Sequence, residues 1–553
     1  MNILLYLCYQ FFNKEYINII ALVCISLFLT LFYTNIASIV NAKLIESIHK
    51  SSYKNSVLFF QFFIGVSLIY FFIMYIYKYI SNHLLTNLVH WSKSEIFNYI
   101  LLANNSNMRN INFVEFITPI TRISNSLYLL LHDVISDIIP SFAFLLMVSG
   151  YMFTLDLKMG LIFLIANIAI FGYFCFNYKE MMKMKNEQEE ISVNNEKYIL
   201  DALNNIDKII YRGQVKKEID EYKKKTDGCI TVSLKMFNYM TNHTFTVNMF
   251  AYGIVIYLIW QNIQLYYKKQ ISNTSFITIL SILMMYRDDI TSTIQRVPSQ
   301  IETFGRTYYI VEEFRKMLGS DQIDAIIDNS IYKDVSLDFE VIKFENVSFK
   351  YESRDKYIFK DYNKEVYLKD KIIGIIGSSG NGKSSFVKLV MRLYSCSEGV
   401  ISIDGKDILT IDPEYIRSNV TYVNQSSRLF DRKIMENILY GCQDLEKCNG
   451  HLRDILSHPQ IRDLYKNVDI EQATAGPLGE NLSGGQRQII NIISGLVNPT
   501  PVLILDEPTN ALDPSLKNEL LSILRNFQKY KKCIFIITHD RDVYSLFDET
   551  IEI

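Results

Sequence analysis

A glycine-rich loop that ends in a lysine and a serine has the clearest chemistry in this sequence. The segment Gly377-Ser378-Ser379-Gly380-Asn381-Gly382-Lys383-Ser384 follows an apolar run at 372–376 and precedes a helical pattern at 386–393. Such glycines let backbone N–H groups wrap phosphate oxygens, and the helix adds a favourable dipole. The segment therefore predicts a nucleotide site, in which Lys383 bridges the β- and γ-phosphates and Ser384 ligates Mg²⁺.

A second apolar run, 502–505, ends in two acidic residues, Asp506 and Glu507. The run predicts a buried strand, and Asp506 at its end is a candidate ligand for Mg²⁺, directly or through water. Phosphoryl transfer needs positioning, charge neutralisation and one group that orients the attacking water. An apolar strand that ends in Asp-Glu is often only a strand end, but downstream of a phosphate-binding loop it indicates a hydrolytic site.

A pentapeptide between these segments, Leu482-Ser483-Gly484-Gly485-Gln486, resembles the signature of the ATP-binding-cassette (ABC) ATPases. In that family the signature is half of a nucleotide site: Ser483 and the backbone amides would meet the γ-phosphate held by a partner cassette. The resemblance implies ATP as the nucleotide and Glu507 as the general base. We call residues 482–486 the signature segment.

Four further residues match the family. Tyr351 stands where ABC cassettes stack an aromatic ring on adenine, and Gln425 stands at the Mg²⁺-sensing Q-loop position. Asp513 ends a segment, 510–513, that resembles the D-loop, which crosses to the partner. His539 follows a predicted strand and matches the histidine that contacts the γ-phosphate; in isolation it is more typical of a structural histidine. The resemblance implies Lys383, Glu507 and His539 as catalytic residues, Ser384, Gln425 and Asp506 as metal ligands, and as further ATP contacts Tyr351, Gly377, Ser378, Gly380, Asn381, Gly382, Ser385 and Asp513.

The N-terminal half contains six apolar runs long enough to cross a bilayer, which takes about 20 residues each. They lie near 16–40, 56–80, 127–154, 159–178, 245–267 and 277–301. A short apolar segment at 1–12 lacks the early basic residues of a signal peptide and predicts an interfacial helix before the first span. The expected fold is therefore multidomain: an all-α transmembrane domain, 1–320, followed by an α/β P-loop domain, 335–553.

The loops between the runs alternate in length, with long lysine-rich loops after the second and fourth spans. This alternation resembles the type IV ABC exporters, in which spans continue into the cytosol and end in coupling helices. The resemblance implies coupling segments at 112–124 and 202–211. Six ordinary spans with solvated loops are the alternative.

Several charges interrupt the spans. Asp133 and Asp137 share one helix face, and Arg287, Asp288 and Asp289 lie in the last run. Charges are expensive in lipid and usually face a polar cavity or a partner charge. One hypothesis places Asp137 and Arg287 in a cavity for a polar or charged substrate. The alternative is an ion pair between helices, or an interface position.

The bulk composition excludes some classes. The net charge of the 553 residues is −2, so no basic nucleic-acid surface is expected. The eight cysteines have no CxxC spacing. They predict neither a zinc site nor a disulfide framework, and mostly fit buried thiols in a reducing compartment.

The sequence departs from the exporter pattern at three positions. Pro477 precedes the signature segment where exporters often carry a glutamate that touches the coupling helices. Ser494 replaces a common arginine, and Pro508 a common alanine. These changes leave every catalytic group in place but put transmission through the Pro477 loop in question.

The chain holds one set of six predicted membrane spans and one cassette, whereas a working pump needs two of each. A second copy of the chain is therefore the expected partner, and a heterodimer is the alternative. The resemblance implies an ATP-driven exporter or flippase, embedded in a lipid membrane of unknown identity, with a cytosolic cassette. A regulator or channel in which ATP gates without pumping is the alternative, and an importer is a weaker one. The sequence does not identify the substrate.

Overall fold

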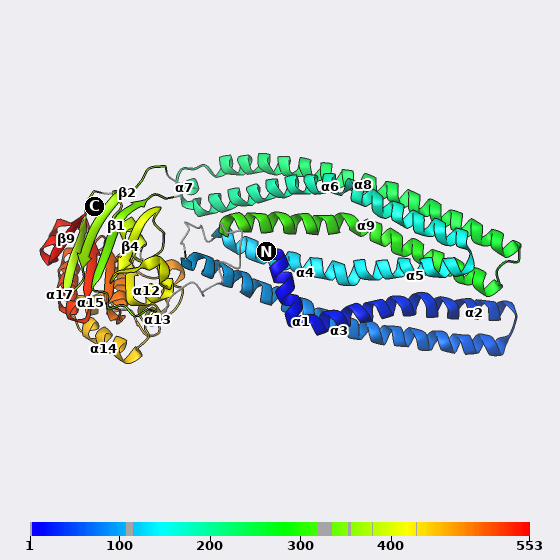
Figure 1. Cartoon of the computed structure of the whole chain (residues 1–553), viewed down its shortest axis with the longest axis horizontal. Helices are drawn as coiled ribbons and strands as arrows, with labels where there is room; N and C mark the ends of the chain where they lie inside the picture. The colour runs from blue at the N-terminus through cyan, green and yellow to red at the C-terminus, as the bar shows by residue number, and fades with distance from the viewer. Residues whose placement is uncertain (1–2, 107–113, 319–334, 352–354, 379, 427) are drawn as a thin grey trace. The chain divides into compact units, whose positions relative to one another are not determined.

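The structure is a computed structural model that describes residues 3–106, 114–318, 335–351, 355–378, 380–426 and 428–553. The chain forms two compact units, a helical unit that holds α1 to α9 apart from the end of α3 after Tyr99, and a mixed unit that holds all the described strands (Figure 1). The outcome agrees with the expected multidomain fold of an all-α unit followed by an α/β unit.

Long helices make up the first unit, and several continue well beyond bilayer length. Their bounds are α1 Ile3–Leu31, η1 Phe32–Ala37, α2 Ser38–His49, α3 Tyr53–Ser106, α4 Val114–Asp133, η2 Val134–Ile138, α5 Ile139–Leu155, α6 Leu157–Asn204, α7 Ile206–Tyr211, α8 Val215–Tyr267 and α9 Asn273–Leu318. Helix α1 has non-helical backbone at Glu15, at the predicted junction between a short helix and the first span. Asp156 caps α6 by accepting from the N–H groups of Lys158 and Met159.

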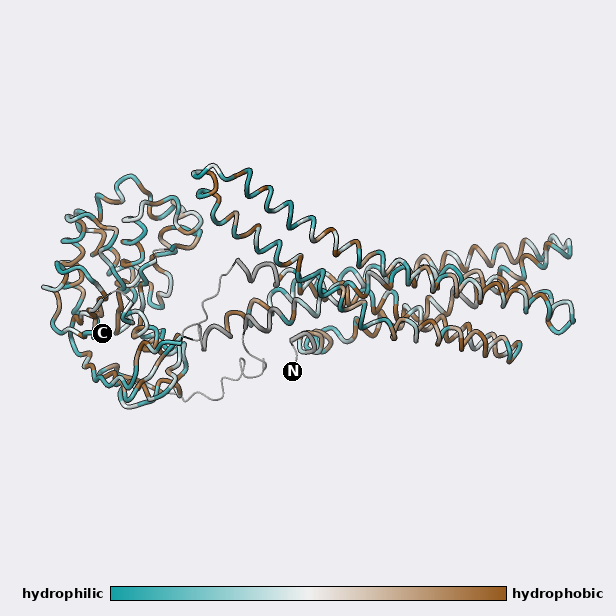
Figure 2. Tube along the Cα trace, turned by 90° about the horizontal axis from the view of Figure 1, so that it is seen from above, coloured by the Kyte–Doolittle hydropathy of each residue, from teal (hydrophilic) through white to brown (hydrophobic). Residues whose placement is uncertain are grey.

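Five helical segments in the described chain are long and apolar enough to span a membrane: 6–31, 53–102, 120–155, 157–204 and 215–267. The sixth predicted span lies in α9, which is a continuous helix but is not among these five segments. Its charged residues 287–289 and Arg296 lower its apolar character. Hydrophilic residues gather where α6, α7 and α8 meet, at the end that the sequence predicts to be cytosolic (Figure 2). The chain is a multi-pass membrane protein.

A buried charge cluster joins three helices beyond the predicted spans. The Lys185 side chain on α6 is fully buried, and its Nζ lies 3.3 Å from both Glu189 Oε2 and Glu302 Oε1. Arg306 on α9 contacts the same two carboxylates at 3.8 and 2.8 Å. Arg122 on α4 lies 3.5 Å from Glu189. Because Glu189 is also buried, each of its cationic partners compensates a desolvated charge.

Replacing Lys185 by methionine is expected to destabilise the helical unit by about 3–5 kcal/mol, because it leaves Glu189 with fewer cations in a buried site. The readout is the midpoint of thermal unfolding of the purified protein. The double variant Lys185→Met/Glu189→Gln removes both charges and should recover most of the loss. Equal destabilisation by the single and double variants would contradict this account.

Two sheets form the mixed unit. The antiparallel sheet has the order β2-β1-β4-β5, and the parallel sheet has the order β6-β7-β8-β3-β9. The strands are β1 Val341–Phe349, β2 Phe359–Tyr367, β3 Lys371–Ile376, β4 Glu398–Ile403, β5 Lys406–Asp407, β6 Val420–Val423, β7 Val502–Asp506, β8 Cys533–Ile537 and β9 Glu549–Glu552. The helices are α11 Lys383–Val390, α12 Pro413–Asn419, α13 Ile434–Ile438, α14 Leu445–Leu456, α15 Pro459–Leu464, α16 Gly484–Val497 and α17 Pro514–Phe527, with short 3-10 turns η4 Ile408–Thr410, η5 Pro477–Gly479, η6 Gln528–Tyr530 and η7 Arg541–Leu546.

The parallel sheet determines where the polar residues meet. Strands β3, β7 and β8 are adjacent, and nearly all of their residues are buried, which explains their continuous apolar sequences. Since parallel strands end at one edge, the segments after all three strands converge there, as in other open α/β sheets. These segments begin at Gly377, Glu507 and Thr538, directly after β3, β7 and β8.

The expectation about the cysteines is wrong in two respects. Cys442 and Cys448 form a disulfide, because the turn between α13 and α14 brings their Cα atoms to 6.6 Å, a distance that a disulfide can bridge. Of the free cysteines in the described chain, only Cys533 is buried. Three others, Cys8, Cys24 and Cys175, are exposed on helices of the helical unit.

Candidate nucleotide-binding site

The glycine loop has the backbone geometry that its sequence requires. Gly380 and Gly382 have φ values of +88° and +104°, in the region that favours glycine. A Cβ at Gly382 would lie 2.5 Å from Ile358 Cγ2, so a larger residue does not fit. Lys383 Nζ donates to the carbonyl oxygens of Gly377 at 2.8 Å and Ser378 at 3.1 Å. The ammonium group therefore lies within the loop, where a phosphate would contact it.

Asp506 collects two hydroxyl groups at the end of β7. Ser384 Oγ donates to Asp506 Oδ2 at 3.0 Å, and the Tyr422 hydroxyl donates to the same oxygen at 2.8 Å. Burial raises the pKa of the Asp506 carboxyl, and the two hydrogen bonds oppose that shift. A hydroxyl and a carboxylate oxygen are donors that Mg²⁺ prefers, so this pair fits a magnesium site. Sequence reasoning missed Tyr422, because tyrosine is common in this chain.

Glu507 and His539 form a pair beside this group. His539 Nδ1 lies 2.8 Å from Glu507 Oε1. The other carboxylate oxygen, Oε2, is buried and has no hydrogen-bond partner in the described chain. Glu507 has φ +51°, an unusual backbone conformation for glutamate, and its N–H donates to Ile537 O at 2.9 Å. A buried carboxylate with one free oxygen is suited to accept a proton from a bound water.

Most of the predicted residues share one cavity of about 540 Å³, but Gly377, Ser378 and Asn381 are not among the residues that line it. The residues that line it are Tyr351, Ile358, Gly380, Gly382, Lys383, Ser384, Ser385, Gln425, Asp506, Glu507, Ile537 and His539. The Tyr351 hydroxyl lies 2.9 Å from Ser385 Oγ. Asn381 does not line the cavity; its amide lies 3.4 Å from Ile553 O. Residues spread over the length of the cassette therefore meet at one site.

The signature segment does not line this cavity. Ser483 is the N-cap of α16 and forms a capping box: its Oγ accepts from Gln486 N at 3.2 Å, and Gln486 Oε1 accepts from Ser483 N at 2.9 Å. Ser483 and Gly484 are exposed, so this helix N-terminus is accessible to an anion. Asp513 also lies elsewhere and caps α17 through the N–H groups of Ser515 and Leu516. Its predicted ATP contact stays a prediction, as does the role of the signature.

Gln488, which sequence reasoning missed, connects the signature helix to the hydrolytic residues. Its side chain is buried, and Nε2 donates to Glu507 O at 2.9 Å. Its Oε1 accepts from Ala511 N at 3.0 Å. One amide on α16 thus holds both the unusual backbone at Glu507 and the segment that leads to Asp513. An isolated glutamine in a helical pattern gives no signal of such a role.

Replacing Gln488 by leucine is expected to lower the kcat of ATP hydrolysis about tenfold, because two buried backbone groups lose their partner and Glu507 shifts. The KM for ATP should change little, since the glycine loop is untouched. Gln488→Glu keeps the acceptor for Ala511 and separates the two contacts. Steady-state kinetics test this, and a KM that rises while kcat stays constant would contradict it.

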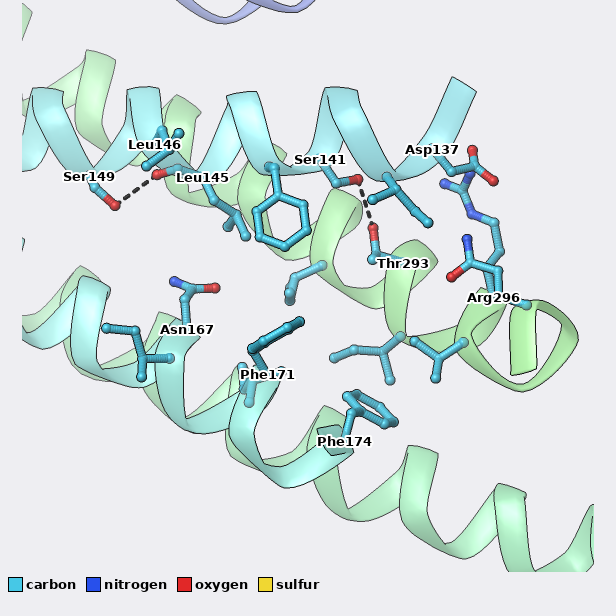
Figure 3. A pocket seen from close by; sticks show the side chains of 18 of the residues that line it. Asp137, Ser141, Leu145, Leu146, Ser149, Asn167, Phe171, Phe174, Thr293 and Arg296 are labelled. Atoms are coloured by element: carbon cyan, nitrogen blue, oxygen red, sulfur yellow. Dashed lines mark hydrogen bonds and ion pairs between the residues drawn. The ribbon is translucent and has the colours of Figure 1, made fainter. Parts of the chain in front are cut away.

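The helical unit contains a cavity, but only half of the predicted charge pair lines it (Figure 3). Asp137 forms an ion pair with Arg296 on α9. Arg287 instead pairs with its neighbour Asp288 at 2.7 Å and does not line the cavity. The placement of Arg287 was therefore wrong. Arg296 lies nine positions after Arg287, which puts the two side chains on opposite faces of α9. The ion pair between helices, which was the alternative, is present with a different arginine.

The second coupling segment contains a short helix, α7, between α6 and α8. Ile206, Ile210 and Tyr211 are exposed on it, which suits a segment that contacts another surface. Residues 112–113 of the first segment lie outside the described residues, and 114–124 form the start of α4. The coupling role of both segments stays a prediction.

Comparisons with known proteins match both units. The model of the ABC transporter transmembrane region matches residues 19–288, and the ABC transporter model matches 360–510. The mating factor M secretion protein mam1 of Schizosaccharomyces pombe is 30% identical over 328 residues, 58% of this chain and 24% of that protein. The ATP-dependent lipid A-core flippase of Pasteurella multocida is 34% identical over 215 residues, 38% of this chain and 36% of that protein. The chain thus matches about a quarter to a third of the length of these relatives.

A solved structure of a bacterial Atm1-family ABC exporter with ATP bound has the same fold. The superposition has a TM-score of 0.79 at 19% identity and covers 98% of this chain and 93% of the other. Three observations support the same family. They are the fold of the helical unit, the two matching family models, and the cavity formed by the glycine loop, Asp506, Glu507 and His539. The chain belongs to the ABC transporter family, with the transmembrane region and the ATP-binding cassette joined in one polypeptide.

Proposed function

We propose that this chain is an ATP-driven exporter or flippase that works as a dimer of two copies. The observation that carries the proposal is the cavity that unites Lys383, Asp506, Glu507 and His539. The names of the relatives, a secretion protein and a lipid flippase, support the direction of transport. The joining of a membrane unit and a cassette in one chain supports direct coupling of hydrolysis to transport.

Hydrolysis in this proposal rests on positioned groups. The glycine loop and Lys383 hold the phosphates, and Glu507 takes the proton from the attacking water while His539 fixes its carboxylate. Ser384 and Asp506, with Gln425, would hold Mg²⁺, which supplies charge neutralisation when bound. Apart from that, every step uses side chains that the cavity already brings together.

The dimer follows from where the signature segment lies. Its exposed helix N-terminus suits a phosphate, yet it does not line the cavity of its own cassette. A second copy in the opposite orientation would supply the missing donors to each cavity. ATP would then favour the closed pair of cassettes, the membrane helices would alternate between inward and outward access, and hydrolysis would reset them.

Gating without pumping is the second candidate, and an intact Glu507–His539 pair argues against it, because gating does not require efficient hydrolysis. The test is Mg²⁺-dependent ATPase activity of the full chain reconstituted in lipid vesicles. The proposal expects steady hydrolysis with a kcat in the ordinary enzyme range of about 1–10³ per second. ATP binding without turnover, together with an ATP-dependent conductance in planar bilayers, would favour gating instead.

A further inference from the structure

The His539 side chain has little support from its own surroundings. It is 68% exposed, and among the described residues its only polar side-chain partner is Glu507, whose Oε1 lies 2.8 Å from His539 Nδ1. An exposed side chain loses rotamer freedom when it is held in one orientation. The Glu507–His539 pair therefore depends on how firmly the backbone is held on either side of it.

Asp540, the next residue, connects the segment after β8 to the segment after β7. Its Oδ2 accepts a hydrogen bond from Thr509 Oγ1 at 3.1 Å, and its N–H donates to Thr538 Oγ1 at 3.0 Å. Thr509 is buried and lies two residues after Glu507. Side chains thus join the two segments at two successive points, once through the Glu507–His539 pair and once through Asp540.

Lys517 on α17 contacts the same carboxylate. Its Nζ lies 2.5 Å from Asp540 Oδ2, and because the Lys517 side chain is only 14% exposed, water and salt screen this ion pair less than an exposed one. The ammonium group holds the pKa of the Asp540 carboxyl below its usual range, so the pair is charged at neutral pH. The N–H of Lys517 donates to the carbonyl oxygen of Asp513, the N-cap of this helix, at 2.9 Å. The ion pair therefore links α17 to the segment that carries His539.

We propose that Asp540 is a positioning residue for ATP hydrolysis, held in place by Thr509 and Lys517. These three residues are called the Asp540 brace. The brace fixes the backbone at His539 relative to Glu507, so that the imidazole keeps its contact with the carboxylate that takes a proton from water. The inference rests on the proposed function, because that function makes Glu507 the proton acceptor.

Asp540→Asn separates the brace from the turn η7, which Asp540 also caps. Asp540 Oδ1 accepts from Asp542 N at 3.1 Å, and the single side-chain oxygen of asparagine can keep that bond. The asparagine NH₂ group then faces Thr509 and Lys517, which are donors themselves, so both bonds are lost. The kcat of ATP hydrolysis by the full chain in lipid vesicles should fall about tenfold. The KM for ATP should stay unchanged, because the glycine loop is untouched.

Asp542→Asn is the matched control. Asp542 lies 2.7 Å from the same lysine, Lys517, but its side chain is 79% exposed and lies outside the brace. This variant should hydrolyse ATP at the wild-type rate. Thr509→Val removes the hydroxyl at nearly constant shape and should lower kcat as well, whereas Thr509→Ser keeps the hydroxyl and should retain most of the activity.

A His539→Ala background distinguishes a positioning role from a general structural one. If Asp540 acts through His539, adding Asp540→Asn to His539→Ala should lower the single-turnover rate of hydrolysis no further. Losses that multiply would overturn the proposal. A rise in KM at constant kcat in Asp540→Asn would overturn it too, as would an equal loss of kcat in Asp542→Asn.

Hydrogen exchange of the full chain without nucleotide tests the brace independently of hydrolysis. Asp540→Asn should speed exchange in the peptides that contain residues 507–512 and 538–543, and Asp542→Asn should speed it in neither. Unchanged exchange over 507–512 would overturn the proposal. A wild-type chain that binds ATP without hydrolysing it would refute the proposed function, and the exchange rates would still decide whether the brace joins the two segments.

Discussion

Replacing Glu507 by glutamine is expected to lower the kcat of ATP hydrolysis about 10²–10⁴-fold, the usual contribution of a general base. Glutamine fills the same space and can still contact His539, but it cannot accept a proton from water. ATP binding should persist, because Lys383 and the glycine loop are unchanged. The measurement is single-turnover hydrolysis together with the amount of ATP retained by the protein.

Glu471→Gln is the matched control, since Glu471 is an exposed acid outside the cavity. It should hydrolyse ATP at the wild-type rate. A Glu507→Gln protein that kept more than about a tenth of the wild-type kcat would show that another group removes the proton, because the loss would then lie below the usual range for a general base.

Replacing Ser483 by arginine is expected to lower the rate of hydrolysis by more than about 10²–10³-fold, the cost of losing one donor to the developing charge, because the arginine also blocks the approach of a partner cassette. Arginine would also place bulk and charge at the exposed N-terminus of α16. ATP binding to an isolated chain should be unaffected, because Ser483 does not line the Lys383 cavity. Both quantities are measured on the same preparation.

Ser483→Ala separates the steric block by arginine from the loss of the hydroxyl and of the helix cap. Both variants remove the bond from Gln486 N to Ser483 Oγ and should cost the cassette about 1 kcal/mol of stability. Only the arginine blocks the approach of a partner. If the two variants lost hydrolysis equally, the loss would reflect the missing hydroxyl or the frayed helix rather than a closed interface.

Local sequence carried most of the nucleotide site. The glycine loop, Asp506 and His539 each follow an apolar strand, and parallel strands place the segments that follow them at one edge of a sheet. The order of the strands in the sheet therefore has little effect on whether the glycine loop, Asp506 and His539 meet. The sequence did not predict that the strands form two sheets, one antiparallel and one parallel, because a short apolar run does not specify which strand it pairs with.

Contacts between distant elements escaped prediction. Gln488 forms a hydrogen bond to Glu507, and Tyr422 forms one to Asp506. The residues next to Gln488 and Tyr422 in the sequence do not predict these bonds. Arg287 was predicted to lie near Asp137 because the two residues have similar depth along their spans. The direction of a side chain also depends on its position around the helix axis, and on α9 it is Arg296 that pairs with Asp137. The Cys442–Cys448 disulfide depends on the path of the turn between the two cysteines, which the sequence did not predict.

The central claim is that each hydrolytic site is built by two chains. Two differently tagged variants, Lys383→Ala and Ser483→Arg, are co-expressed, and the mixed dimer is isolated by both tags. Each parent has two incomplete sites, whereas the mixed dimer has one site with an intact Lys383 and an intact Ser483 from opposite chains. ATPase activity in the mixed dimer is expected to be well above that of both parents. Activity no higher than that of the parents would contradict it.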